Sequence, residues 1–264
     1  MDIIRPRLTD YHGIHKNQAD LDFAIQFFDE DIPLYVDPFL LWKSPSQQDN
    51  ALYTTITNSF NHLNYLIKKK QEDEALSILI DISECHEVGL GVSKTRKGTK
   101  ISEKQAQDIL SLFKDIPEYS QFGFTHFEII QLYISGISKD RISDITCNYL
   151  KSFLIDYTIE QCEINKIPTE GVILNSIYNY KTNKLDTNQK VYLPVNPLTK
   201  EPLIFTPKRW LRFNTWINYE DYFQKYCPRD EIFNPDEPEE RVKVLNFNRE
   251  HYGTIEGYIE YKTK

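Results

Sequence analysis

Polar side chains recur at every fourth position between residues 140 and 152, at Asp140, Asp144, Asn148 and Ser152. The surrounding apolar residues follow a helical period, so these four side chains share one helix face. Carboxylate and amide oxygens are the ligands that hard divalent cations prefer. Acids in the first turn of a helix also stabilise it through the helix dipole. The row therefore predicts either a cation site or an ordinary acidic helix start.

A second group of residues that could bind a ligand lies in segment 83–100, which we call the glycine-bearing segment. Gly89, Gly91 and Gly98 are three of only nine glycines in the chain. The same segment carries four cations, Lys94, Arg96, Lys97 and Lys100. Glycine lets a backbone approach a ligand closely, and the capping-box pattern at 102–105 predicts a helix N-terminus beside the segment. We expect either a phosphate-binding loop or a solvated surface loop, since the P-loop and GxGxxG patterns are absent.

A compact basic and aromatic patch follows at 208–212, where Lys208, Arg209 and Arg212 flank Trp210. Cations beside an aromatic ring can contact phosphates and stack on a base. The same residues also describe a strand end whose long side chains pack their stems on the core. Both interpretations stay open at this point.

Together these residues suggest a metal-dependent nuclease acting on DNA or RNA. Asp140 and Asp144, with Glu87 or alternatively Glu128, would hold Mg²⁺, the only cofactor that this hypothesis requires. Lys208 would stabilise charge on the phosphate, and the cations of 94–100 with Arg209 and Arg212 would bind the backbone. The chain departs from the PD-(D/E)xK pattern, because Thr206 stands two residues before the lysine where an acid is needed.

Helical periods supply most of the elements that must position these residues. Apolar residues spaced by three and four predict a helix over 49–70, and a second helix over 72–81 completes a hairpin. The longest pattern predicts one helix over 139–165, and shorter patterns predict helices over 218–226 and 249–262.

Strand patterns concentrate after residue 167, at 171–177, 190–194 and 202–207. Two earlier apolar runs, 23–28 and 33–42, are expected to be extended. The acids between and within them, Asp29, Glu30, Asp31 and Asp37, would either hold a cation or cap turns. We predict an α+β fold with a helix-rich N-terminal two thirds and a smaller strand-containing C-terminal part. It forms one compact domain over 1–264, or subdivides into 1–166 and 167–264.

Composition narrows the classes of function. The 264 residues carry a net charge of −8, with a sequence pI near 5.3, so nucleic acid can be bound only through a local basic patch or a cation. The four cysteines show no metal-ligand spacing, and we expect reduced thiols. No segment is apolar enough for a signal peptide or a membrane span, which predicts a cytoplasmic protein without a membrane partner.

Four stretches resemble a family of uncharacterised bacterial proteins associated with mobile elements and phage-defence loci. They are residues 31–41, 87–91, 140–146 and 203–208. The resemblance implies a biological setting, antiviral defence, and assigns no role to any residue.

The competing hypothesis is an adaptor or sensor of such a defence system, which would bind a larger effector, an ATPase or nuclease encoded nearby. The chain has 17 tyrosines and 15 phenylalanines, and aromatic side chains are enriched at protein interfaces. The absence of a strong catalytic motif favours this hypothesis over the nuclease.

Overall fold

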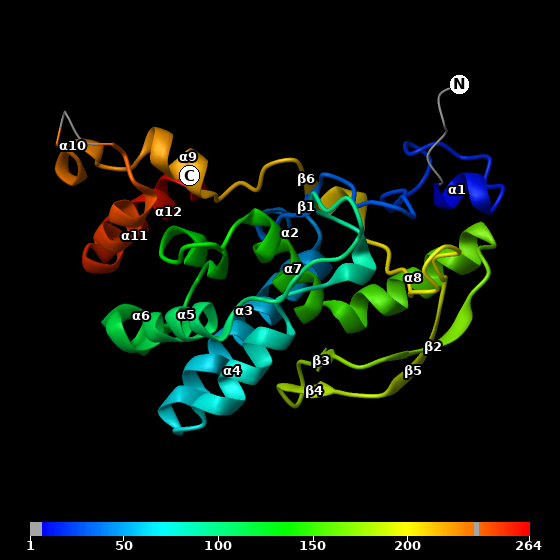
Figure 1. Ribbon diagram of the computed structural model, residues 1–264, viewed down its shortest axis with the longest axis horizontal. Coiled ribbons are helices and arrows are strands. Elements are labelled where there is room, and N and C mark those ends of the chain that lie inside the picture. The colour runs from blue at the N-terminus through cyan, green and yellow to red at the C-terminus, as the bar shows by residue number, and fades with distance from the viewer. Residues whose placement is uncertain (1–6, 235–237) are drawn as a thin grey trace.

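The computed structural model describes residues 7–234 and 238–264. About 51% of the described residues are helical, and the short antiparallel strands lie mainly in the C-terminal half, which confirms the predicted α+β class. Figure 1 shows α1 at one end of the molecule and α9 to α12 at the other. No helix among the described residues is long and apolar enough to cross a membrane.

The helices and strands have the following bounds. The α-helices are α1 (Leu8–Tyr11), α2 (Pro38–Trp42), α3 (Gln47–Lys68), α4 (Glu72–Asp81), α5 (Glu103–Asp115), α6 (Pro117–Phe122), α7 (Lys139–Tyr149), α8 (Lys151–Asn165), α9 (Tyr219–Lys225), α10 (Arg229–Ile232), α11 (Arg241–Glu250) and α12 (Tyr252–Thr263). The 3-10 helices are η1 (His86–Val88), η2 (Phe127–Leu132) and η3 (Lys208–Trp210). The strands are β1 (Tyr35–Val36), β2 (Glu170–Leu174), β3 (Ile177–Asn179), β4 (Lys184–Asp186), β5 (Gln189–Leu193) and β6 (Leu211–Arg212).

The α3–α4 hairpin has the predicted boundaries to within two residues. The stripe Ile56, Phe60 and Leu63 is fully buried because these residues recur on one helix face. The side chain of Ser46 caps α3 by accepting a hydrogen bond from the Asp49 backbone. The hairpin packs on α5 and α7, so it forms the helical side of the core.

The capping box before α5 is also confirmed. The Ser102 hydroxyl accepts from the Gln105 backbone, and the Gln105 side chain accepts from the Ser102 backbone. Each side chain satisfies an N–H that the helix leaves without a partner. The box therefore marks the end of the glycine-bearing segment and the start of α5.

The prediction of one helix over 139–165 is wrong. The chain leaves the helical conformation at Leu150, with φ −96° and ψ 8°, and divides into α7 and α8. We attribute the break to tertiary packing, since α7 is buried continuously from Ile142 to Tyr149. Lys151, the first residue after the break, donates a hydrogen bond to Glu87 at 3.0 Å.

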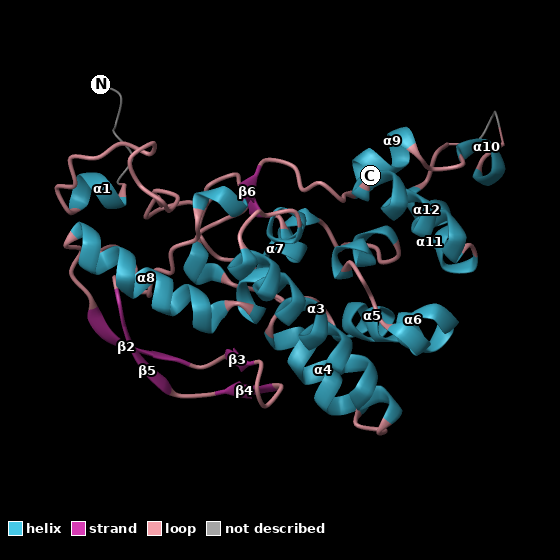
Figure 2. Ribbon diagram, turned by 180° about the vertical axis from the view of Figure 1, so that it is seen from behind, coloured by secondary structure: helices cyan, strands magenta, loops and turns pink. Residues whose placement is uncertain are grey.

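The strands form three separate antiparallel pairs, β1 with β6, β2 with β5 and β3 with β4. In the longest pair Glu170 lies opposite Leu193 and Leu174 opposite Gln189. Figures 1 and 2 both show this hairpin below α8, and β5 and β3 contact that helix. Leu174 and Leu193 point inward and are buried, so the hairpin covers the helical core from one side.

Two of the expected extended segments differ in the structure. Segment 202–207 forms no strand, because its backbone bonds scatter over different neighbours, such as Ile204 to Glu87 and Phe205 to the Thr158 hydroxyl. Segment 33–42 is extended only at β1 and then becomes α2. Asp37 starts that helix by accepting a hydrogen bond from the Phe39 backbone. Of the two roles predicted for this acid, the structure therefore shows the capping role.

The C-terminal prediction is partly wrong. The helix expected over 249–262 begins at Tyr252, after a break at His251, and α11 precedes it. The expectation for 218–226 is confirmed by α9. All four cysteines are free thiols, and Cys85, Cys147 and Cys162 are buried, as expected.

A buried amide joins α7 to the segment after α4. The Asn148 side chain donates to the carbonyls of Ile82 and Glu84 at 2.8 and 2.9 Å. Replacing it by alanine (Asn148→Ala) leaves both carbonyls short of a partner, so we expect the free energy of unfolding to fall by about 2–3 kcal/mol. Urea denaturation measures this change. The exposed Asn58→Ala should shift the free energy by less than about 0.5 kcal/mol, and equal losses would refute the role assigned to Asn148.

Candidate functional site

Four carboxylates from three distant segments converge beside the glycine-bearing segment. They are Asp31 before β1, Glu84 after α4, and Asp140 and Asp144 on α7. A methyl group at Gly91 would lie 2.6 Å from Asp140 Oδ1 and 3.5 Å from Asp31 Oδ2, so these two acids flank that glycine. We call Asp31, Glu84, Asp140 and Asp144 the acid cluster.

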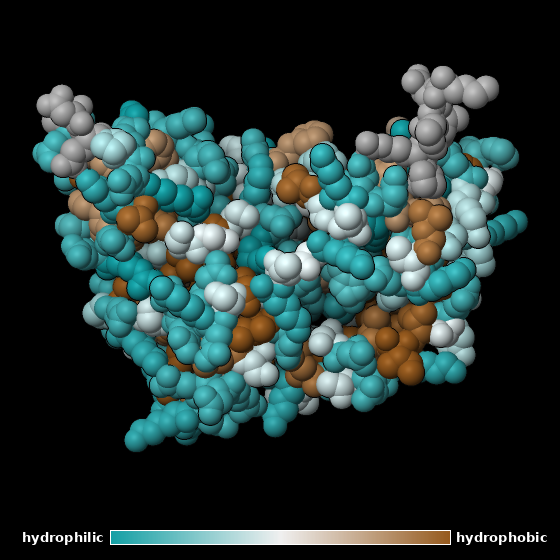
Figure 3. Space-filling view, viewed as in Figure 1, coloured by the Kyte–Doolittle hydropathy of each residue, from teal (hydrophilic) through white to brown (hydrophobic). Residues whose placement is uncertain are grey.

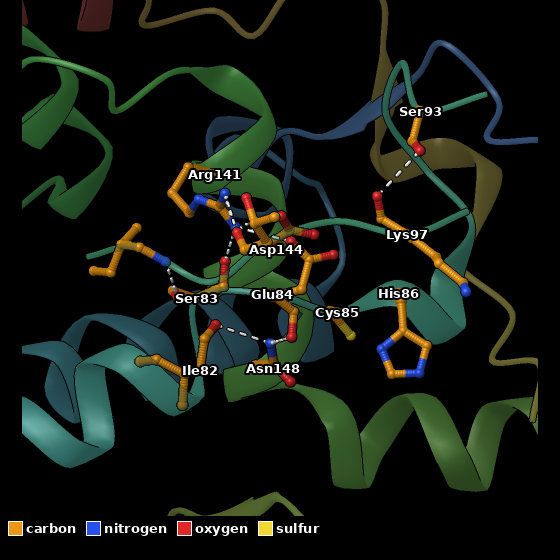
Figure 4. Close-up of polar contacts among 12 residues, drawn as sticks. Ile82, Ser83, Glu84, Cys85, His86, Ser93, Lys97, Arg141, Asp144 and Asn148 are labelled. Atoms are coloured by element: carbon orange, nitrogen blue, oxygen red, sulfur yellow. Dashed lines mark hydrogen bonds and ion pairs between the residues drawn. The ribbon is translucent and has the colours of Figure 1, made fainter. Parts of the chain in front are cut away.

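Arg141 ties the acid cluster together. One guanidinium nitrogen, Nη1, lies 3.0 Å from Glu84 Oε2 and 3.3 Å from Asp144 Oδ2. The guanidinium also donates to the backbone carbonyls of Ser83 and Thr99. Figure 4 shows Arg141 reaching from α7 toward Ser83 and Glu84, with Asp144 beside it. The segment after α4 and the start of α7 are thereby held against each other.

Burial and mutual repulsion raise the pKa of three of the four acids. Desolvation raises the pKa of Asp31 to about 6, against attraction from Arg96 and with further repulsion from Asp140. Desolvation and then Glu84 and Asp140 raise the pKa of Asp144 well above its usual range. Desolvation also raises the pKa of Asp140. The neighbouring cations therefore do not offset the cost of holding these carboxylates together.

Arg96 is buried, which corrects the expectation that it faces a phosphate. Its guanidinium is 3% exposed and donates to the carbonyls of Phe27, His86 and Glu87. Gly89, with φ +59°, lies directly against it, and a Cβ there would come within 2.1 Å of Arg96 Nη1. The glycine is thus needed to admit the chain's own arginine rather than a ligand.

The other cations of segment 83–100 remain on the surface. Lys94 and Lys97 are exposed, and Lys100 pairs with Asp81 at 2.5 Å. Gly91 lies against Asp140, and Arg141 donates to the Thr99 carbonyl, so the backbone of this segment adjoins the start of α7. The structure therefore does bring the two predicted groups, the acid row and the basic segment, together.

A charged cavity of about 300 Å³ adjoins the acid cluster and shares Glu84 with it. Glu87, expected to be a metal ligand, forms an ion pair with Lys151 at 3.0 Å, and both residues line this cavity. Lys151 and the proximity of His86 lower the pKa of Glu87 despite its burial. His86 and Lys100 complete the polar wall, and β2 closes the apolar side with Leu174.

The structure does not bring Lys208, Arg209 and Arg212 to the acid cluster, contrary to the nuclease hypothesis. The Lys208 ammonium donates to the carbonyls of Gln18 and Ala19. Arg209 pairs with Asp49 at 3.0 Å, and Arg212 lies 3.9 Å from Asp37. Lys208 therefore joins η3 to the N-terminal segment, Arg209 joins η3 to α3, and Arg212 joins β6 to the start of α2.

The alternative acid, Glu128, also lies elsewhere, beside the buried His126. Within residues 7–234 and 238–264, no three His, Cys, Asp or Glu side chains are already arranged as ligands of a metal ion. In the acid cluster the reason is Arg141, because its guanidinium pairs with Glu84 and Asp144 and takes the place that a metal ion would need.

The sequence predicts Asp140 and Asp144 through their spacing and leaves Asp31 as either a cation ligand or a turn residue, but it does not join Asp31 or Glu84 to α7. No local pattern identifies these two acids, because they meet α7 only through the tertiary fold. One available clue is Gly98, where a Cβ would come within 2.0 Å of Glu84 Oε1.

Comparison with known proteins gives one match. A family model described as "Domain of unknown function (DUF8370)" matches residues 13–218. No curated protein and no solved structure matches the chain. The matched region contains the whole acid cluster and the charged cavity, and it ends before α9.

The raised pKa of Asp31 predicts an unusual pH dependence of stability. Between pH 3.8 and about 6 the folded state keeps a proton that the unfolded chain has lost, so this group lowers stability as the pH rises. Asp31→Asn should therefore stabilise the protein above about pH 6 and give no gain below pH 3.8. Urea midpoints across this range measure the effect. Asp29→Asn removes the same charge from an exposed position; an identical profile for both variants would contradict the assignment.

Proposed function

We propose that this chain, which belongs to the DUF8370 family of domains of unknown function, is a divalent-cation-dependent phosphodiesterase acting on DNA or RNA. The observation that carries the proposal is the convergence of four acids from three segments, three of them with raised pKa. Carboxylates held together at this cost are expected where a cation or a shared proton relieves the repulsion. Mg²⁺ or Mn²⁺ meets that need through oxygen ligands.

In this proposal the acid cluster binds the cation and Arg141 binds the substrate. The carboxylate oxygens of the acid cluster would hold the cation, and Arg141, which now pairs with Glu84 and Asp144, would have to release both acids. The cation would activate a water and polarise the phosphate. The displaced Arg141 becomes available to a phosphate oxygen, which a planar guanidinium binds through paired hydrogen bonds.

The surface around the cluster supports a nucleic-acid substrate. Lys94 and Lys97 are exposed on the glycine-bearing segment, and phosphate contacts through lysine are sensitive to salt. The protein as a whole carries a net charge of −8, so a bound cation and these lysines are required to attract a polyanion. Lys208 has no part in this proposal.

The biological setting proposed is antiviral defence in the bacterial cytoplasm. It is supported by the resemblance of residues 31–41, 87–91, 140–146 and 203–208 to proteins of phage-defence loci. The four free thiols suit a reducing compartment.

The function is tested by incubating the protein with plasmid DNA and with RNA in the presence of Mg²⁺ or Mn²⁺. We expect cleavage that EDTA abolishes, and a decrease of about two orders of magnitude or more for Asp144→Asn, because a neutral amide binds a divalent cation poorly. Asp156→Asn, which changes an exposed acid on the adjoining α8, should cleave like the parent. A parent protein that cleaves neither substrate with either metal would end the proposal.

A second function, the adaptor for a larger effector, is favoured by the surface of the β2–β5 hairpin. Its outward face presents Ile173 and Tyr192, which are 63% and 57% exposed. Both edges of the hairpin are open among the described strands, and open edges and apolar faces are typical of binding surfaces. In Figure 3 an apolar patch lies low on the right, where Figure 1 places β2 and β5.

This adaptor function predicts that Ile173→Asp abolishes co-purification of the effector encoded next to the protein. The change places a charge on the outward face, while the inward Leu174 keeps its packing. The control is Ile164→Asp, which alters an equally exposed isoleucine, 59% exposed, near the end of α8. Retention of the effector by Ile173→Asp, or its loss with both variants, would contradict the assigned surface.

A further inference from the structure

A second cavity, of about 310 Å³, lies between the family-matched region and the C-terminal helix α12. Trp42, Tyr119 and His126 line it from one side, and Tyr252, Glu256 and Ile259 from α12 line it from the other. Its size is within the range of small-molecule sites. It shares no lining residue with the charged cavity beside the acid cluster.

A buried histidine is fixed in one orientation at this cavity. His126 is 2% exposed, and its Nδ1 lies 2.6 Å from the Tyr53 hydroxyl and 3.2 Å from Glu128 Oε1. The Tyr53 hydroxyl donates to the Thr125 carbonyl at 2.9 Å. Because the Tyr53 hydroxyl donates elsewhere and a carboxylate only accepts, we assign the Nδ1–H tautomer, in which Nδ1 donates to the tyrosine and the carboxylate. Nε2 is then an acceptor, and no described residue hydrogen-bonds to it.

The carboxylate behind the histidine is itself incompletely satisfied. Glu128 is 1% exposed, and its Oε2 has no hydrogen-bond partner among the described residues. An unpaired buried carboxylate oxygen is costly unless the site uses its charge. Through Nδ1 this charge makes Nε2 a stronger acceptor, so the cavity is suited to a ligand that carries an N–H or O–H donor.

The walls and the rim restrict the ligand further. Tyr119 and Tyr252 meet edge to face, with ring centroids 5.2 Å apart, and Trp42 lies against the His126 ring at 5.3 Å. Such aromatic walls favour a planar ring. Glu256 and Glu260 are exposed on α12 and also line the cavity. They repel anions, including nucleotides, and attract a cation.

We propose that this cavity binds a small aromatic amine, with a donor on its ring and a cationic group on its side chain. The ring N–H or O–H donates to His126 Nε2, the ring packs among Trp42, Tyr119 and Tyr252, and the ammonium pairs with Glu256 or Glu260. Binding would join α12 to the family-matched region. The site is independent of the phosphodiesterase proposal, because none of its residues belongs to the acid cluster.

Isothermal titration with three indoles tests the proposal. Tryptamine has the ring N–H and the ammonium, 1-methyltryptamine lacks the ring donor, and indole-3-acetate carries an anion instead of the ammonium. We expect saturable binding of tryptamine, binding weaker by about tenfold or more for 1-methyltryptamine, and none for indole-3-acetate. Absence of tryptamine binding, or equal binding of all three compounds, would overturn the proposal.

Variants assign the binding to this cavity. The double variant Glu256→Gln and Glu260→Gln changes only exposed side chains, so it should fold normally and weaken tryptamine by about tenfold. Ile259→Trp should fill the cavity and abolish binding. His126→Gln should remove the difference between tryptamine and 1-methyltryptamine. Undiminished binding to the Glu256/Glu260 double variant, with a normal urea midpoint, would show that the amine binds elsewhere.

Discussion

The architecture around the acid cluster depends on one buried guanidinium. Arg96 donates to the carbonyls of Phe27, His86 and Glu87 and so joins the N-terminal segment to η1. A buried arginine is stable only when its donors are satisfied and a counter-charge is near, which here is Asp31. Asp31 is thereby held next to Asp140. The segment 83–100, which carries Arg96, is held against the start of α7. Without Arg96, the carboxylates of the cluster would repel one another with fewer compensating contacts.

The parts of the fold that local chemistry determines were predictable from the sequence. The α3–α4 hairpin follows from an apolar period, and the start of α5 follows from Ser102 and Gln105, because each of these features acts within one or two helical turns. The break at Leu150 was not predictable. No glycine or proline occurs from 137 to 167, and the apolar period continues through the break. Only the distant pairing of Lys151 with Glu87 and the continuous burial from Ile142 to Tyr149 distinguish two helices from one.

The candidate site also combines residues that local sequence predicts with residues that only the tertiary fold brings together. Asp140 and Asp144 were found because a helix places residues four apart on one face. Asp31 and Glu84 join them through contacts that span more than 50 residues of sequence, as the Arg141–Glu84 pair shows. Residue type alone also misled the prediction. Arg96 and Lys208 were taken for ligands of phosphate, yet both bind backbone carbonyls, because a cation near an irregular segment can satisfy peptide oxygens as well as substrate oxygens.

Buried charge distinguishes the two sites from the rest of the core. The Glu87–Lys151 pair is neutral overall, and packing explains it as well as function does. The acid cluster and Glu128 are different, since desolvation and neighbouring carboxylates raise the pKa of Asp144, and Glu128 Oε2 has no hydrogen-bond partner among the described residues. Apolar residues of similar size would make a more stable protein at such positions. The two proposals assign a ligand to each place, a metal cation to the cluster and a hydrogen-bond donor to His126. Both proposals rest on these incompletely satisfied carboxyl groups more than on the shape of either cavity.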